Sequence, residues 1–176
     1  MATGISRATR EMMMHVQEII NSNYHLYEHI VDPQDASEHR VDEAWADRNF
    51  KIREFYLLQD DDEDIFVGAG SFQVLDDFAY VGYLYIRHGF QRRGYGERLI
   101  SFLERRAIED GIADLRLFVN EQATWAREFY KKMGFSIYMS RKADILGIGG
   151  GIMCPFYEEG SLFMRKSLAS KHENKK

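Results

Sequence analysis

The chain of 176 residues has a single cysteine, Cys154, and only two prolines. One thiol excludes an internal disulfide framework and a zinc site built from several thiolates, which is typical of proteins from a reducing compartment. No apolar run approaches the roughly 18 residues that cross a bilayer, and the charged N-terminus lacks a stretch of signal-peptide type. These absences predict a cytoplasmic protein without a membrane partner.

The chain also lacks a basic excess, because 28 acidic residues outnumber 23 lysines and arginines and give a formal net charge of -5. Surfaces that bind nucleic acid usually carry a positive balance, so we expect no nucleic-acid partner, and the acidic balance favours a cationic substrate. The six histidines form no His-Glu-x-x-His pattern, and the acidic run at residues 60–64 lacks the glycine and distal glutamate of a calcium loop. We expect no metal.

The composition is that of an ordinary globular protein, with 45% apolar and 29% charged residues. A chain of this size buries roughly 70% of its unfolded surface and needs no second core. We therefore expect one domain over residues 1–168, followed by a polar tail at residues 169–176 that has little apolar surface to anchor it.

Hydrophobic periodicity predicts an α/β layout: a strand, two helices, three strands, a glycine-rich loop with its helix, a strand, a helix and two closing strands. The three central strands, at residues 55–58, 65–74 and 78–86, are separated by acidic turns and indicate an antiparallel meander. Thr9 is the expected N-cap of the first helix. Gly82 lies inside the third strand, where it marks either a bulge or close approach of another chain, or a plain packing position.

The most informative segment is QRRGYG at residues 91–96, between an apolar strand and an amphipathic helix. Two glycines two apart let the backbone turn tightly and approach a bulky anion, and the helix start offers unpaired N–H groups and a positive dipole end. The two arginines add positive charge. The segment is thus predicted to be a phosphate cradle, although it has neither the Gly-Lys-Ser/Thr of a P-loop nor the three spaced glycines of a dinucleotide fingerprint.

In this setting the pattern Gln/Arg-x-x-Gly-x-Gly/Ala resembles the coenzyme A pyrophosphate loop of the GNAT superfamily of N-acetyltransferases. A second pattern agrees, since Ala126, Tyr130, Gly134 and Phe135 match the family's Ala, Tyr and Gly-Phe. The resemblance extends along nearly the whole chain, from residues 5–9 to residues 162–166. It implies a GNAT-like fold with a mixed, mostly antiparallel central sheet flanked by about four helices.

The resemblance further implies an acetyl-CoA-dependent N-acetyltransferase that transfers the acetyl group directly to a primary amine in a ternary complex. Acetyl-CoA is then the acyl donor, no metal takes part, and the acceptor is a small-molecule or peptide amine. A homodimer is compatible with this family, although no residue identifies its interface. The alternative is a non-catalytic acyl-CoA-binding module or sensor.

By resemblance Tyr130 is the general acid that protonates the departing thiolate. Relatives often place an asparagine seven residues before this tyrosine, where the chain has Ala123, and Asn120 at the end of a strand is expected to take over its contact with the cofactor. The strand before the cradle, the cradle and the helix start are expected to hold coenzyme A through Leu84, Tyr85, Ile86, Gln91, Arg92, Arg93, Gly94, Tyr95, Gly96 and Glu97.

The general base stays unassigned, because many relatives carry a glutamate on the strand before the cradle and residues 78–86 contain no carboxylate. The candidates are a water chain and the side chains of Glu28, His29, Asp76, Tyr83 and Glu158. The glycine-rich segment at residues 147–155 is either a mobile lid over the acceptor or an inert connection. Cys154, without a recognisable base beside it, is expected to be a bystander rather than a nucleophile.

Overall fold

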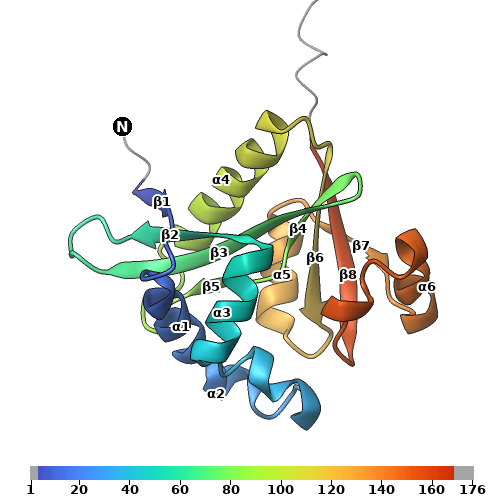
Figure 1. Ribbon diagram of the computed structural model, residues 1–176, viewed down its shortest axis with the longest axis horizontal. Helices are drawn as coiled ribbons and strands as arrows, with labels where there is room; N and C mark the ends of the chain where they lie inside the picture. The colour runs from blue at the N-terminus through green and yellow to red at the C-terminus, as the bar shows by residue number, and fades with distance from the viewer. Residues whose placement is uncertain (1–3, 169–176) are drawn as a thin grey trace, which may run out of the picture.

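The computed structural model describes residues 4–168 (Figure 1); the predicted polar tail lies outside this part of the chain. The helices are α1 (Met13–Asn21), α2 (Tyr24–Tyr27), α3 (Glu43–Ile52), α4 (Tyr95–Glu109), α5 (Thr124–Lys132) and α6 (Lys142–Gly147), and the short 3-10 helices are η1 (Pro33–Glu38), η2 (Ile148–Gly150) and η3 (Cys154–Phe156). The strands are β1 (Ile5–Arg7), β2 (Glu54–Gln59), β3 (Phe66–Leu75), β4 (Phe78–Val81), β5 (Leu84–Ile86), β6 (Asp114–Asn120), β7 (Ser136–Met139) and β8 (Ser161–Ser167).

The strands form one mixed sheet in the order β1-β2-β3-β4-β6-β8-β7, and β5 pairs with β3 beside this path. Neighbouring strands are antiparallel except for β4 and β6, which run parallel. The parallel pair requires a crossover connection, and α4 supplies it. The predicted meander of β2, β3 and the strands after them is confirmed, as is the mostly antiparallel α/β layout.

Helices cover both faces of the sheet (Figure 1). Along β2 the side chains alternate between the two faces, as the period of a strand requires. Phe55 and Leu57 pack with α1 and α3 in one core cluster, whereas Tyr56 and Leu58 pack on the side of α4. This alternation leaves β2 buried on both sides and fixes its register against β3.

The expected single strand at residues 78–86 is wrong, because the chain divides there into β4 and β5. The hydroxyl of Ser71 on β3 accepts from the backbone N–H groups of both Gly82 and Tyr83, at 2.9 Å each. β4 then pairs with the far end of β3 and with β6, while β5 pairs only with residues 68–70 of β3 among the described strands. The sheet therefore opens between β5 and β6.

Gly82 marks this division because another side chain approaches it closely. A β-carbon at Gly82 would lie 2.1 Å from Nη1 of Arg53, a largely buried residue. The Arg53 guanidinium lies over the rings of Tyr83 and Phe156, with its central carbon 5.2 Å from each centroid. Of the two interpretations of Gly82, the structure thus supports the packing position, since its close neighbour is an arginine side chain of the same chain.

Other sequence expectations are corrected at helix ends and in the glycine-rich segment. Thr9 is not the N-cap of α1, because the helix begins at Met13 after Met12, which provides no side-chain cap. Residues 142–156 fold into α6, η2 and η3 around the buried side chains of Ile145 and Met153, which pack on Phe78 and Phe163. Between residues 4 and 168, no helix combines the length and the apolarity needed to span a bilayer.

Candidate active site

The predicted phosphate cradle forms the turn that opens α4. Gly94 is the N-cap of α4 with φ of 84°, a left-handed conformation that a β-carbon would strain, and no side chain caps the helix there. The first-turn N–H groups have no partners within the helix, so they are open to an anion. A β-carbon on Gly94 would meet nothing within 4 Å, which leaves the approach to this turn clear. The segment fits a diphosphate group.

Gly96 has a different role from Gly94, since it lies inside the first turn of α4. A β-carbon there would be 3.0 Å from Cζ of Phe129 on α5. Gly96 therefore lets the cradle helix approach the helix that carries Tyr130. Only Gly94 makes the turn that the sequence pattern predicts for the pair.

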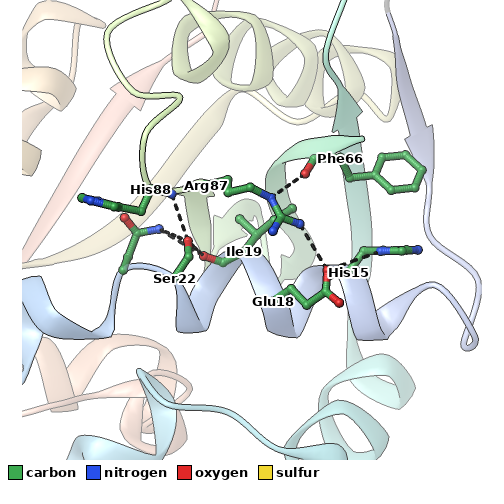
Figure 2. Close-up of polar contacts among 8 residues, drawn as sticks. His15, Glu18, Ile19, Ser22, Phe66, Arg87 and His88 are labelled. Atoms are coloured by element: carbon green, nitrogen blue, oxygen red, sulfur yellow. Dashed lines mark hydrogen bonds and ion pairs between the residues drawn. The ribbon is translucent and has the colours of Figure 1, made fainter. Parts of the chain in front are cut away.

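The loop that leads into the cradle is fastened to the side of α1 (Figure 2). Arg87 donates from Nε to the carbonyl oxygen of Phe66 at 3.0 Å and from Nη2 to the carboxylate of Glu18 at 3.2 Å. The next residue, His88, donates its backbone N–H to the hydroxyl of Ser22 at 3.0 Å. These contacts hold the end of β5 and the start of the loop in one place.

The structure brings the predicted cradle residues together, and the side chains of two of them bond to the loop itself. Gln91 donates from Nε2 to Oδ1 of Asn23 at 3.0 Å and accepts from the N–H of Gly89 at 2.8 Å. Arg93 lies over the ring of Phe90 and donates to the carbonyl oxygen of Gly89. The cradle thus presents backbone groups, while the side chains of Gln91 and Arg93 stabilise the loop.

Tyr95, the first residue of α4, is held by the acidic turn that precedes β3. Its hydroxyl donates to a carboxylate oxygen of Asp60. This bond, together with the backbone N–H groups of Asp62 and Glu63, lowers the pKa of Asp60. The acidic run therefore contributes a carboxylate that orients the start of the cradle helix.

A cleft with a cavity of about 80 Å³ lies where the sheet opens. It is lined by residues of α2, β4, β5, β6, α5 and η3, by the residue that follows η1, and by the segment before β8. Tyr130 lines it from α5 and is 8% exposed. Its hydroxyl forms no hydrogen bond with any residue from 4 to 168, and its ring packs on Phe129 and Phe135. Burial raises the pKa of Tyr130, so the hydroxyl keeps its proton at neutral pH.

Asn120 also lines the cleft, at the end of β6. Its Nδ2 donates to the carbonyl oxygen of Ile30 at 3.3 Å, and its Oδ1 accepts from the N–H of Gln122 at 2.9 Å. The amide thereby ties the segment after α2 to the sheet. One amide hydrogen remains for a further contact.

Two side chains that come from distant parts of the sequence meet on the other wall of the cleft. Nε2 of His39 lies 2.8 Å from Oε2 of Glu158, and Nδ1 lies 3.2 Å from the hydroxyl of Tyr85. The side chains of His39 and Glu158 are only 12% and 27% exposed, and the His39 ring stacks on Tyr27 at 4.9 Å between centroids. Sequence reasoning missed His39, because no local pattern distinguishes it from the other histidines.

The remaining base candidates lie elsewhere. Glu28 and His29 pair with each other at the surface, where the His29 side chain is 84% exposed. Asp76 follows β3 in the turn to β4. Tyr83 is buried, and its hydroxyl oxygen accepts a hydrogen bond of 3.0 Å from the indole N–H of Trp45. Of the five candidate side chains, Glu158 is the one that lines the cleft.

The residue that follows the glycine-rich segment, Phe156 on η3, lines the cleft. Cys154 in the same segment is exposed, with its sulfur 3.6 Å from the carbonyl oxygen of Leu146. Within residues 4–168, no group of three or more His, Cys, Asp or Glu side chains is arranged to hold a metal ion.

A sequence model of the acetyltransferase (GNAT) family matches residues 15–135, which include the cradle and Tyr130. The chain belongs to the GNAT acetyltransferase family. This confirms the family predicted from the cradle and from the second pattern around Tyr130. No protein of curated function matches the sequence.

Solved GNAT structures share the fold of this GNAT chain. It is similar to the PaiA N-acetyltransferase of Thermoplasma acidophilum in complex with coenzyme A, with a TM-score of 0.69 and 17% identity over 93% of this chain and 97% of that one. For a GNAT acetyltransferase of Staphylococcus aureus Mu50, the TM-score is 0.70 and the identity 17%, over 94% of this chain and 98% of that one. For the ribosomal-protein-S18-alanine N-acetyltransferase of Escherichia coli, the TM-score is 0.62 and the identity 19%, over 98% of this chain and 97% of that one.

Proposed function

We propose that this GNAT-family acetyltransferase transfers the acetyl group of acetyl-CoA directly to a primary amine in a ternary complex. The observation that carries the proposal is the Tyr130 hydroxyl, which has no hydrogen-bond partner among residues 4–168 and borders a cleft beside the open side of β5. The strand that leads to the cradle, β5, lines the same cleft through Leu84 and Tyr85. Donor binding and a proton donor thus share one site.

The donor is held mainly by backbone groups in this proposal. The N–H groups of residues 93–97 bind the pyrophosphate, with charge from Arg92 and Arg93, and the N–H and C=O groups of β5 (Leu84–Ile86) pair with the pantetheine as an added strand would. The remaining amide hydrogen of Asn120 contacts the donor from the opposite wall. Acetyl-CoA itself supplies the thioester carbon that the amine attacks.

Tyr130 acts as the general acid. Because burial raises its pKa, its Oη still carries a proton at the pH at which amines begin to lose theirs. The hydroxyl gives this proton to the sulfur as the carbon–sulfur bond breaks. The fall in activity that would follow from loss of this proton is therefore expected above about pH 10, the ordinary range of tyrosine.

The test is thiol release from acetyl-CoA with spermidine, kanamycin, lysine and a peptide with N-terminal alanine, with mass spectrometry of each product. We expect turnover with at least one acceptor, rising with pH as the amine loses its proton. Tight coenzyme A binding without transfer to any amine would contradict it and support the alternative, a non-catalytic acyl-CoA-binding module. Ala123 at the family's asparagine position and the lack of a carboxylate in residues 78–86 are what favour that alternative.

Calorimetry tests the donor site separately. Coenzyme A is expected to bind much more tightly than ATP or inorganic phosphate, since the pantetheine adds contacts along β5. Equal competition by ATP or phosphate would contradict the proposed donor and indicate a general phosphate site.

A further inference from the structure

We propose that Tyr85 and His39 form a proton relay that accepts the proton of the attacking amine, with Glu158 as the residue that positions it. The proposal rests on the proposed function and assigns the general base that the sequence left open. It depends on three contacts in the cleft: Tyr85 to His39, His39 to Glu158, and the stacking of His39 on Tyr27.

The hydrogen bonds determine where the histidine proton lies. The carboxylate of Glu158 can only accept, so the 2.8 Å contact requires a proton on Nε2 of His39. In the neutral ring Nδ1 is then an acceptor, and the Tyr85 hydroxyl at 3.2 Å donates to it. The relay is thus aligned so that a proton moves from Tyr85 to His39.

Tyr85 presents its hydroxyl oxygen to the substrate. Tyr85, His39, Glu158 and Tyr130 all line the one cleft. Because the hydroxyl hydrogen of Tyr85 points to His39, the oxygen lone pairs remain free to accept a hydrogen bond from an amine N–H. Burial raises the pKa of Tyr85, which keeps the hydroxyl neutral and able to pass one proton on as it receives another.

The step balances in atoms and charge. As the nitrogen lone pair forms the new bond to the acetyl carbon, the amine proton passes to Oη of Tyr85 and the former Tyr85 proton passes to Nδ1 of His39. The carbon–sulfur bond breaks, and the sulfur takes the proton of Tyr130. His39 returns its proton to solvent, Tyr130 recovers one from solvent, and the net products are an amide and a thiol.

His39 lies beside carboxylates and phenol rings. Glu158 bonds it directly, and Asp35 on η1 lies close enough to be influenced by both Glu158 and His39. Burial and then the charge of Glu158 raise the pKa of Asp35. Glu38, the preceding residue, accepts from the Tyr83 hydroxyl, and the two rings facing His39, from Tyr27 and Tyr85, are neutral phenols. The charged groups facing His39 are therefore acidic.

The pH dependence of the His39→Gln variant tests the relay, with His29→Gln as the matched control. The acceptor is the best amine of the panel above, and the ratio of wild-type to variant kcat/KM cancels the titration of the amine itself. We expect a ratio of about 100 at alkaline pH. The ratio should fall toward one on acidification, because a protonated imidazole cannot accept the proton. The control should stay near one throughout.

Three further variants separate the relay from structural damage. Tyr85→Phe should lower kcat as much as His39→Gln while leaving the affinity for coenzyme A unchanged. Glu158→Gln should keep part of the activity, because its amide oxygen can still accept from Nε2 of His39, whereas Glu158→Ala should lose it. A ratio that does not vary with pH, or Tyr85→Phe with wild-type kcat, would overturn the relay.

Nitrogen NMR of the full chain gives a readout that does not depend on turnover. At neutral pH we expect His39 to carry its proton on Nε2, and Tyr85→Phe should shift its Nδ1 resonance. A proton on Nδ1 would overturn the relay. Absence of wild-type turnover with every amine would contradict the proposed function, whereas turnover with a pH-independent ratio would contradict the relay alone.

Discussion

The two halves of the cleft are built in different ways. In the proposed function, the donor half is one continuous stretch, residues 84–97, which runs from β5 through the cradle into the first turn of α4. The proposed acceptor half is assembled from α2, the residue after η1 and the segment before β8. His39 lies 46 residues before Tyr85 and 119 residues before Glu158.

The difference follows from what each half must bind. A diphosphate and an extended pantetheine are recognised by backbone N–H and C=O groups, so the requirement falls on turn geometry and on the glycines that permit it. An amine that must lose a proton needs particular side chains at particular distances, and those can come from any segment that reaches the cleft. The first requirement leaves a local sequence pattern, and the second does not.

Tyr130 lies where the two halves meet, and its removal should have the largest effect. Tyr130→Phe keeps the ring that packs on Phe129 and Phe135 but removes the proton donor. We expect kcat to fall about 100-fold, within the range for a general acid, with coenzyme A affinity unchanged. The matched control is Tyr138→Phe on the partly exposed strand β7. If Tyr130→Phe keeps the wild-type kcat, the proposed role of Tyr130 as general acid is contradicted.

A substitution at the contact between Gly96 and Phe129 tests whether the packing of α4 against α5, the helix that carries Tyr130, affects catalysis. Gly96→Ala places a methyl group about 3.0 Å from Cζ of Phe129, and such overpacking typically costs about 1–3 kcal/mol. We expect a lower free energy of unfolding together with a lower kcat. Adding Phe129→Leu should restore part of both, and independent effects of the two changes would show that the helices are not coupled.

Gly94 tests the donor half by itself. Gly94→Ala must hold φ near 84°, and a left-handed residue with a side chain costs about 1–2 kcal/mol. We expect the Kd for coenzyme A to rise about tenfold as the turn relaxes and its N–H groups lose alignment. Gly111→Ala is the matched control, since Gly111 has φ of 75° with equally open surroundings at the other end of α4. Equal losses of affinity in both variants would contradict a local role for the cradle.

The same contrast explains how much the sequence could predict. The cradle and the meander follow from local patterns of glycine, aromatic and apolar residues, and Tyr130 in the cleft follows from the family resemblance that those patterns carry. The division of residues 78–86 could not be predicted, because it depends on the Ser71 hydroxyl of a neighbouring strand and on Arg53 at Gly82. His39 could not be predicted either, since its partners are defined only once the chain has folded.

Substitution of Asn120 has the smallest expected effect on coenzyme A affinity, and it tests to which of the two halves this residue belongs. It already bonds Ile30 and Gln122 on the acceptor side, while the proposal gives its remaining amide hydrogen to the donor. Asn120→Ala should raise the Kd for coenzyme A about fivefold, the net worth of one hydrogen bond of about 1 kcal/mol. An unchanged Kd with a raised KM for the amine would instead place Asn120 wholly in the acceptor half, and the donor half would then end at the first turn of α4.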